Sequence, residues 1–412
     1  MEVRPGYKQS EVGVIPNDWD TSSLLAVADC LDNVRVPLNE GQRQRMQGDI
    51  PYCGANGVLD YVNDFVIDDD IVLMAEDGGY FDQYASRPIA YRMKGKCWVN
   101  NHAHILKAKS GHDQGFLYYA LVHKNILPFL ASGTRAKLNK SEMEKIIVPA
   151  PPTEAEQRAI AAALSDVDAL LGGLDRLIAK KRDLKQAAMQ QLLTGQTRLP
   201  GFHGEWEPLN MTKTSTLKAR IGWQGLTTAE YLPTGNYYLV TGTDFAHGRV
   251  QWSTCCFVSG ERYAQDRHIQ LIPRDILLTK DGTIGKVGFV DSLPGPATLN
   301  SGVFVIRPKA GAYDPQFFYY VLTSHIFDDF LRRLKAGSTI SHLYQKDFVS
   351  FSFLAPAKVP EQTAIAAVLS DMDAELAALE ARRDKTRDLK QAMMQELLTG
   401  KTRLVSTGGA HA

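Results

Sequence analysis

The sequence predicts an α+β fold in which two long helices separate two β-rich domains and pair as an antiparallel coiled coil. The first observation is an internal pseudo-twofold repeat: residues 156–199 align with residues 361–404 without a gap, and 29 of the 44 positions are identical. The second is a 4-3-4-3 spacing of apolar residues in both copies, which is typical of a coiled-coil seam. The third is that short β-branched or aromatic runs, bounded by Gly, Pro and Asp, fill the segments outside the repeat.

These observations divide the 412 residues into five consecutive segments. We expect a first β-rich domain at 1–152, a first helix at 153–199, a second β-rich domain at 200–356, a second helix at 357–404 and a flexible tail at 405–412. A helical hairpin buried within one large domain is the alternative to this division.

Each helix has a seam, a start and a stop. The seam residues are Ile160, Leu164, Val167, Leu171 and Leu174 in the first copy, and Ile365, Leu369, Met372, Leu376 and Leu379 in the second. After a charged middle, the seam is expected to resume at Leu184, Ala188 and Leu192, and at Leu389, Met393 and Leu397. Thr153 with Glu156 forms a capping box, and Gly195 and Gly400 end the helices. Gly172-Gly173, replaced by alanines in the second copy, predicts close helix approach or a slight bend.

The β-rich domains repeat each other more distantly. "DIVLMAEDG" (70–78) resembles "DILLTKDG" (275–282), and "WVNNHAHILKAK" (98–109) resembles "TLNSGVFVIRPK" (298–309). "SGTRAKL" (132–138) likewise parallels "GSTISHL" (337–343). The two domains therefore share one design, but their sequences have diverged far more than the helices have.

Composition excludes several classes of protein. The start "MEVRPGYKQS" is polar, and no apolar stretch reaches the roughly 18 residues of a membrane helix. Five cysteines without a CxxC pair indicate buried thiols in a reducing cytoplasm. The net charge is zero, but residues 208–355 hold 15 Lys and Arg against 11 Asp and Glu. A neutral average can conceal basic surfaces, because binding responds to local potential.

Catalytic and metal-binding interpretations find little support. "DGTIGKVG" (281–288) lacks the spacing and the Ser or Thr of a phosphate loop. The acids at 68–70, with Glu76 and Asp77, lack a lysine at nuclease spacing, and an acidic loop is the better interpretation. His102 and His104 have metal-ligand spacing but no evident third ligand. No Ser-His-Asp pattern or amino-methylation motif is found, so we expect neither catalysis nor a cofactor.

Binding residues are more numerous. Small-residue turns that carry hydroxyl and basic groups suit phosphate contact, whereas Arg, Asn and Gln make bidentate contacts with bases. The candidate DNA-binding residues are Arg43, Gln44, Arg45, Tyr52, Asn56, Thr134, Arg135 and Lys137 in the first domain, and Arg220, Trp223, Gln224, Lys280, Lys286, Ser338, Thr339 and His342 in the second.

At this point the chain resembles the specificity subunits of type I restriction-modification systems. The resemblance rests on "YKQSEVGVIPNDW", "PYCGANGVLDYV", "AEDGG", "WVNNHAHIL", "RIGWQGLT", "LLTKDGTIGKVGFV" and the two "EQxAIAAxLSDxD…LKQAxMQxLLTGxTRL" helices. It implies two target-recognition domains, each reading one half of a bipartite site in double-stranded DNA. It also implies that the helices space the half-sites and dock two methyltransferase subunits, and that motor-nuclease restriction subunits complete the complex.

The resemblance extends to partners and to the absence of catalysis. The helix residues assigned to partner docking are Lys185, Gln186, Leu192, Leu193, Lys390, Gln391, Leu397 and Leu398. The chain itself is expected to be a non-catalytic, cytoplasmic adaptor. A self-sufficient DNA-modifying enzyme and a structural protein that dimerises through its coiled coil are the rival hypotheses.

Overall fold

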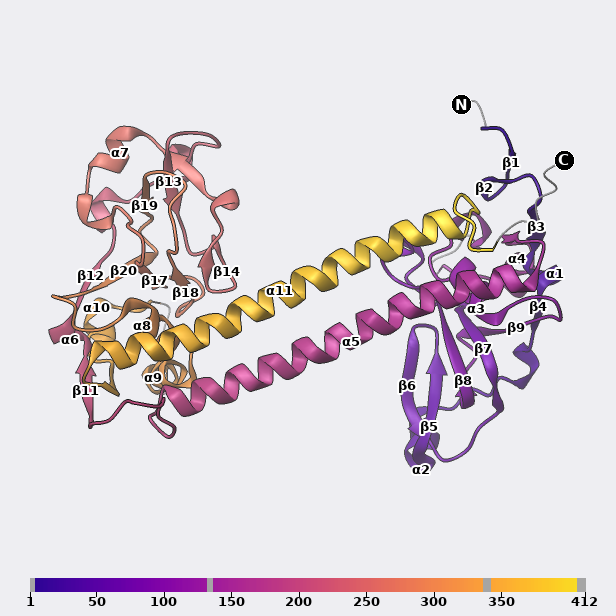
Figure 1. Cartoon of the computed structure of the whole chain (residues 1–412), viewed down its shortest axis with the longest axis horizontal. Helices are drawn as coiled ribbons and strands as arrows, with labels where there is room; N and C mark the ends of the chain where they lie inside the picture. The colour runs from indigo at the N-terminus through magenta and orange to yellow at the C-terminus, as the bar shows by residue number, and fades with distance from the viewer. Residues whose placement is uncertain (1–3, 132–135, 336–341, 406–412) are drawn as a thin grey trace. The chain divides into compact units, whose positions relative to one another are not determined.

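The computed structural model of the chain describes residues 4–131, 136–335 and 342–405. Its contacts divide it into two compact units: unit 1 is Met1–Asp175 with Ala381–Ala412, and unit 2 is Arg176–Glu380. Each unit therefore contains one β-rich domain, half of the first long helix and half of the second (Figure 1).

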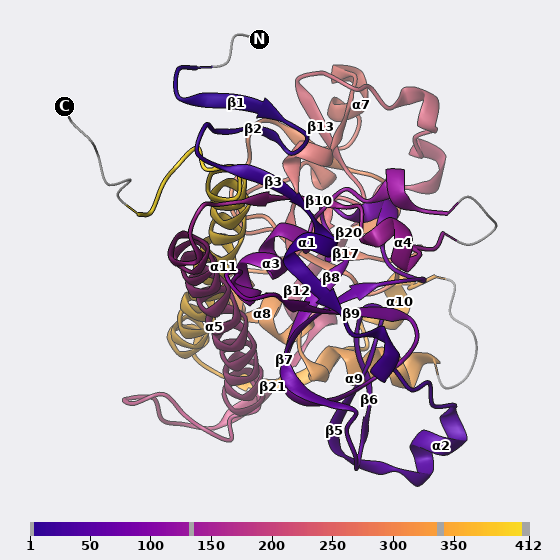
Figure 2. The same cartoon turned by 90° about the vertical axis from the view of Figure 1, so that its right-hand side faces the viewer.

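Unit 1 contains a six-stranded sheet in the order β4-β9-β7-β8-β5-β6 and the two-stranded pairs β1-β2 and β3-β10 (Figure 2). Its strands are β1 (Tyr7–Ser10), β2 (Gly13–Pro16), β3 (Asp20–Ser23), β4 (Ala28–Cys30), β5 (Gln47–Gly54), β6 (Gly57–Val62), β7 (Ile67–Ala75), β8 (Ala90–Val99), β9 (Ala103–Ala108) and β10 (Ile147–Ala150). Its helices are η1 (Asp32–Val34), η2 (Phe81–Gln83), η3 (Leu127–Phe129), α1 (Leu24–Val27), α2 (Glu40–Arg45), α3 (Gln114–Leu121) and α4 (Lys140–Met143), with the first half of α5 (Glu154–Leu192) and the second half of α11 (Val359–Leu397).

In unit 2 the strands β12-β20-β17-β18 repeat β4-β9-β7-β8, and the pair β15-β14 extends this sheet beyond β18. The three-stranded sheet β16-β13-β19 has the pairing of β6-β5-β8 in unit 1, and the antiparallel pair β11-β21 corresponds to β3-β10. Its strands are β11 (Trp206–Asn210), β12 (Ser215–Lys218), β13 (Tyr237–Val240), β14 (Phe245–Ala246), β15 (Arg249–Val250), β16 (Cys256–Val258), β17 (Ile276–Thr279), β18 (Val287–Phe289), β19 (Ala297–Leu299), β20 (Val303–Pro308) and β21 (Ser352–Pro356). Its helices are η4 (Gly222–Gln224), η5 (Thr228–Glu230), η6 (Trp252–Thr254), η7 (Arg267–Ile269), α6 (Met211–Thr214), α7 (Gly260–Ala264), α8 (Pro315–Leu322), α9 (His325–Lys335) and α10 (Gln345–Phe348), with the remaining halves of α5 and α11.

The central strand of each sheet contains a continuous buried run. In unit 1, β7 pairs antiparallel with both β8 and β9, and its residues Ile71–Ala75 are fully buried. In unit 2, β17 pairs antiparallel with β18 and β20, and all four of its residues are buried. A strand that is covered on both faces needs a continuous apolar run, which "IVLMA" and "ILL" supply.

Each core is completed by residues from both long helices. In unit 1, Ile160 and Leu164 of α5 and Leu397 of α11 pack with α3 and the sheet. In unit 2, Leu193 from the end of α5 and Leu369 of α11 pack with α8 and the sheet. The helices are therefore built into each unit and do not merely link the domains.

Within each unit the two helix segments run antiparallel. In unit 1, Asp168 of α5 pairs with Lys390 of α11 at 2.6 Å, and Glu156 pairs with Arg403 beyond the end of α11. In unit 2, Asp373 of α11 pairs with Lys185 of α5, Glu380 pairs with Arg182, and Glu361 pairs with Arg198. In both units a rising residue number on one helix meets a falling number on the other, which confirms the predicted orientation.

Two details of the predicted helices need correction. Leu184 and Leu389 are 47% and 56% exposed, so the seam does not resume at these residues. Instead Ile178, which the predicted seam did not include, is 2% exposed. A Cβ atom on Gly173 would meet nothing within 4 Å, so close helix approach does not require this glycine.

The two ends of the described chain meet in unit 1. The Tyr7 hydroxyl donates to the Gly400 carbonyl at 3.2 Å, and Arg403 donates to the Asp18 carboxylate at 3.0 Å. Gly400 has φ of 65°, and a Cβ atom there would lie 2.6 Å from Pro16, so both backbone and space favour glycine. None of the described helices combines the length and the apolar composition needed to cross a bilayer.

Candidate nucleic-acid interface

The end of the central strand is built in the same way in both units. In unit 1 the Glu76 amide donates to the His102 carbonyl at 2.9 Å, and the Glu76 carbonyl accepts from the Leu138 amide at 2.7 Å. In unit 2 the Lys280 amide donates to the Gly302 carbonyl at 2.9 Å, and the Lys280 carbonyl accepts from the Leu343 amide at 2.8 Å. Each strand end is thus held between the turn before β9 or β20 and the last residue of "SGTRAKL" or "GSTISHL".

A tight turn follows each strand end. Gly78 and Gly282 both have φ of 68°, a left-handed conformation that glycine adopts without strain. Asp77 and Asp281, the residues before these glycines, occupy matching positions. Their backbones form isolated antiparallel β-bridges, Asp77 with Lys137 and Asp281 with His342. The two strand ends therefore share one backbone design, while their side chains differ.

Several predicted DNA-binding residues gather at these strand ends. In unit 1 the Asn56 side chain donates to the Gly78 carbonyl at 2.9 Å, and Lys137 pairs with Glu76 at 2.8 Å while its side chain stays 45% exposed. In unit 2, Lys280 directly precedes Asp281, which pairs with His342, and the Lys286 ammonium donates to the Gly242 carbonyl at 3.2 Å.

Another predicted group lies on α2. Arg43 donates to the Asp60 carboxylate at 3.1 Å and lies over the Tyr52 ring, and exposed Gln44 donates to Glu40. Arg45, at the end of the helix, is exposed. The prediction for Tyr52 needs correction, because its side chain is 2% exposed and its hydroxyl is bonded to the backbone of Leu38.

Two of the predicted DNA-binding residues near η4, Arg220 and Gln224, are buried. Arg220 is 2% exposed and donates to the Leu299 carbonyl at 2.9 Å and to the Thr298 hydroxyl at 3.2 Å, so its assignment to DNA also needs correction. Burial lowers the pKa of Arg220, and nearby Arg262 adds to this effect. Gln224 is 7% exposed. Thr134, Arg135, Ser338, Thr339 and the side chain of Trp223 lie outside the described residues.

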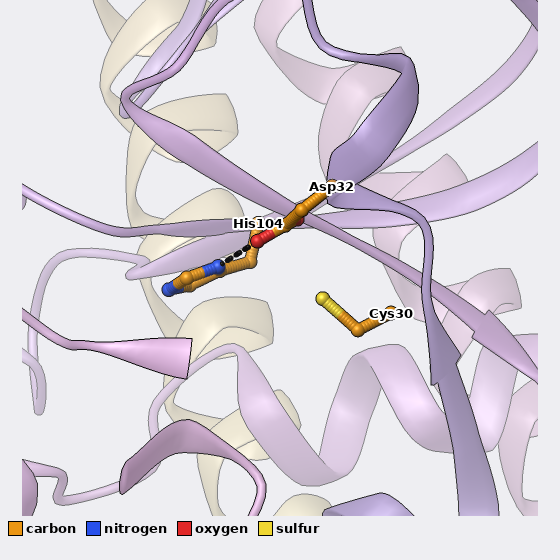
Figure 3. A group of neighbouring side chains, drawn as sticks. All are labelled: Cys30, Asp32 and His104. Atoms are coloured by element: carbon orange, nitrogen blue, oxygen red, sulfur yellow. Dashed lines mark hydrogen bonds and ion pairs between the residues drawn. The ribbon is translucent and has the colours of Figure 1, made fainter. Parts of the chain in front are cut away.

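A buried charged network supports the strand end of unit 1. His104, which is 1% exposed, contacts Asp32 through Nδ1 at 2.6 Å (Figure 3). Its Nε2 atom contacts the Leu138 carbonyl at 2.8 Å. Arg35 reaches Asp32 at 3.1 Å and Glu76 at 2.5 Å. Burial opposes ionisation of both acids, but hydrogen bonds from His104 to Asp32 and from Lys137 to Glu76 outweigh it, so both pKa values are lowered.

Cys30 lies beside this network, and its sulfur is within 4.8 Å of ligand atoms of Asp32 and His104 (Figure 3). Burial, reinforced by Asp32, raises the pKa of the Cys30 thiol to about 12, which keeps it protonated. The Asp32 oxygens already accept from Ile105, His104 and Arg35, and the adjacent bases disfavour a further cation. We interpret the cluster as a structural ion network that fixes the strand end.

The predicted partner-docking residues divide into internal and exposed ones. Leu192, Leu193 and Leu397 are 7%, 0% and 3% exposed, so they belong to the cores and their assignment to a partner needs correction. Leu398 is half-buried against the unit 1 core. Gln186 and Gln391 are exposed at matching positions of the repeat.

Lys185 and Lys390 take part in two equivalent triads. In unit 1 the Tyr119 hydroxyl donates to Asp168 at 2.7 Å, and Lys390 contacts the other oxygen of the same carboxylate. In unit 2 the Tyr320 hydroxyl donates to Asp373 at 2.7 Å, and Lys185 completes the set. Burial, strengthened by the aspartate, raises the pKa of Tyr320, as it does for Tyr119, so both hydroxyls remain donors. The triads were not predicted, although all their members recur in both copies.

A groove of about 1060 Å³ opens beside the unit 2 triad. Its lining includes Lys185, Gln186 and Gln190 of α5, together with Arg249 and His325 of the β-rich domain. The lining also includes Asp328 and the α11 acids Asp373 and Glu380, so the groove presents both basic and acidic groups from the two long helices and from the domain.

Comparison with known proteins is consistent with this architecture. The family model described as the type I restriction modification DNA specificity domain matches residues 16–179 and 228–386. A protein of Haemophilus influenzae, named as a type I restriction enzyme specificity subunit, is 40% identical over 129 residues, which are 31% of this chain and 32% of that protein. The MjaVIII specificity subunit of Methanocaldococcus jannaschii is 25% identical over 313 residues, or 71% of each chain. A crystal structure of a type I S subunit from M. genitalium has the same fold, with a TM-score of 0.64 and 15% identity over 96% of this chain and 98% of that one.

Proposed function

The chain belongs to the family of type I restriction-modification DNA specificity subunits, and from that membership we propose that it reads a bipartite site in double-stranded DNA. Each recognition domain contacts one half-site, and the long helices hold the two domains and dock two methyltransferase subunits. Restriction subunits complete the complex, and this chain contributes recognition without catalysis, in the cytoplasm.

The observation that carries this proposal is the contrast between the paired helices with their triads, which are the same in both units, and the strand ends, which differ. The helix pairing and the triads are the same in both units, whereas Glu76 and His104 of unit 1 correspond to Lys280 and Phe304 of unit 2. A repeated arrangement of helices and triads, with different side chains at equivalent strand ends, suits a protein that binds two like partners and two unlike half-sites.

Surface residues that are identical in the two copies support a docking site for one methyltransferase subunit on each unit. Asp183, Gln186 and Gln190 fall three and four residues apart on α5 and are exposed. Their counterparts at Asp388, Gln391 and Gln395 of α11 are exposed too. Intramolecular packing does not account for identity at exposed positions, so we assign these two faces, with neighbouring Leu184 and Leu389, to the two partner subunits.

The test is reconstitution followed by sequencing of methylated DNA. The purified chain alone should neither cleave nor methylate DNA, and with its methyltransferase subunits it should direct methylation to a single split motif. Methyl transfer by the isolated chain would overturn the assignment as an adaptor. For the docking surface, Gln186→Glu combined with Gln391→Glu should weaken capture of the methyltransferase, and the matched Arg158→Glu control should not.

A further inference from the structure

An aspartate–histidine pair stands at the same strand end in both units, but the histidine comes from different segments. In unit 1, Asp77 contacts His102 Nδ1 at 2.6 Å, and His102 lies in the turn before β9. In unit 2, Asp281 contacts Nδ1 of His342, which lies in the segment before α10. Position 102 corresponds to Gly302 in the second copy, and position 342 corresponds to Lys137 in the first.

The geometry shows that one pair can replace the other. A Cβ atom on Gly302 would lie 3.7 Å from the Asp281 Cβ atom and 3.8 Å from its Oδ2, at ordinary contact distance. A side chain introduced at position 302 would therefore begin beside Asp281, at the position that corresponds to His102 beside Asp77. Both units therefore contain an aspartate–histidine pair at the strand end, with the histidine supplied by a different segment in each, although most neighbouring side chains differ.

Both imidazoles are accessible. The side chains of His102 and His342 are 42% and 28% exposed. In each pair the contact between the aspartate carboxylate and Nδ1 sets the orientation of the imidazole ring, and Nε2 is left available to contact another group. Among the described residues, the structure records a partner for Nδ1 of each ring and none for Nε2.

We propose that Asp77–His102 and Asp281–His342 are equivalent contact points for the phosphodiester backbone of DNA. This inference rests on the proposed function and names the chemical group that one part of the interface contacts. The two domains are expected to read different bases, so a feature kept in both is suited to the part of DNA that is the same at every site. With a phosphate oxygen at Nε2 and a carboxylate at Nδ1, the bound imidazole donates from both nitrogens.

The alternative is that the pairs only stabilise the turn. A turn needs a donor for the aspartate, and lysine, serine or arginine would serve equally well. In unit 1, Lys137 adjoins Asp77 through the backbone bridge, yet its ammonium pairs with Glu76 and the imidazole of His102 contacts the aspartate. The recurrence of histidine from two segments therefore favours a role for the imidazole itself.

The test measures duplex DNA binding by the full chain assembled with its methyltransferase subunits, at several salt concentrations. His102→Asn and His342→Asn should each weaken binding to the methylated motif and to a scrambled duplex by the same factor, roughly tenfold. Each should also reduce the slope of log affinity against log salt by about 0.9, as expected for the loss of one phosphate contact. His268→Asn, at an exposed histidine of η7, is the matched control and should change neither quantity.

A relocation variant separates the imidazole's contact from a folding defect. Gly302→His combined with His342→Asn moves the unit 2 histidine to the unit 1 position and should restore the salt slope. Unchanged slopes in both single variants, or a loss confined to particular base pairs, would overturn the phosphate assignment while leaving DNA reading intact. Failure of the unmodified complex to bind its motif would instead overturn the proposed function.

Discussion

Removing one partner of the ion pair between Glu156 and Arg403 should destabilise unit 1 by several kcal/mol. Glu156 is 1% exposed, and both of its carboxylate oxygens accept from Arg403, one of them at 2.8 Å. Arg403→Met would leave this carboxylate buried without a counter-charge, which costs about 3–5 kcal/mol. The additional contact of Arg403 with half-exposed Asp18 adds at most about 1 kcal/mol.

A double variant tests the origin of this cost. In Arg403→Met with Glu156→Met, two apolar side chains replace the pair, no charge remains buried, and most of the lost stability should return. Arg158→Met is the matched control, because Arg158 and Glu154 form a pair that is 66% and 41% exposed on the same helix. We expect this control to change the free energy of unfolding by less than about 1 kcal/mol.

The measurement is urea unfolding followed by fluorine NMR of 5-fluorotryptophan. Trp19 lies 5.7 Å from the Arg403 guanidinium in unit 1, and Trp206 lies 5.9 Å from the Arg198 guanidinium in unit 2, so each unit carries its own reporter. Arg403→Met should lower the urea midpoint of the Trp19 signal. A loss below about 1 kcal/mol, or a double variant no more stable than the single one, would refute the reasoning.

Four further outcomes are expected. Hydrogen bonds lower the folded-state pKa of Glu76 despite its burial. The ionised Glu76 should therefore stabilise the fold at pH values above the pKa it has in the unfolded chain, and this stabilisation should be lost as the pH falls below about 5. In urea titrations, Glu76→Gln should make the free energy of unfolding less dependent on pH in this range. Gly173→Ala should raise the free energy of unfolding by about 1 kcal/mol, since the site has open space. Arg45→Ala should relax reading of one half-site by ~1–3 kcal/mol, measured on duplexes altered in that half-site only. Four residues inserted after both Leu174 and Leu379 should lengthen the unread spacer by one base pair, because the added rotation of ~40° is close to the ~35° of one base-pair step, and the ~6 Å of added length exceeds its ~3.4 Å rise by only ~2.6 Å, which loops or DNA can absorb. Sequencing of the methylated sites decides this.

The helices could be predicted because their signals are local. A coiled-coil spacing, a capping box and a terminal glycine all lie within one segment, and the duplication implied two like units. The exposure of Leu184 and Leu389 could not be predicted, since it depends on where the partner helix and the domain leave each helix face open. Periodicity identifies an apolar face, but it does not identify what covers that face.

The site was harder to predict because its contacts are distant in sequence. Arg220 and Tyr52 look like binding residues in glycine-rich loops, yet the fold places both inside. The ion network joins Asp32, His104 and Leu138, which no local pattern connects. The triads offered a usable signal, because their Tyr, Asp and Lys recur in both copies of the repeat.

The different divergence of helices and domains has a physical reason in the contacts of individual residues. A triad aspartate such as Asp168 touches a domain tyrosine and a lysine of the other helix, so any substitution leaves a polar partner unpaired. At the strand ends Asp77 contacts the imidazole of His102 and Asp281 contacts that of His342, so the histidine comes from a different segment in each unit. Internal contacts therefore explain identity at the triads and freedom at the strand ends. They do not explain identity at exposed helix positions such as Gln186 and Gln391, which the proposed docking of one partner subunit on each unit would explain.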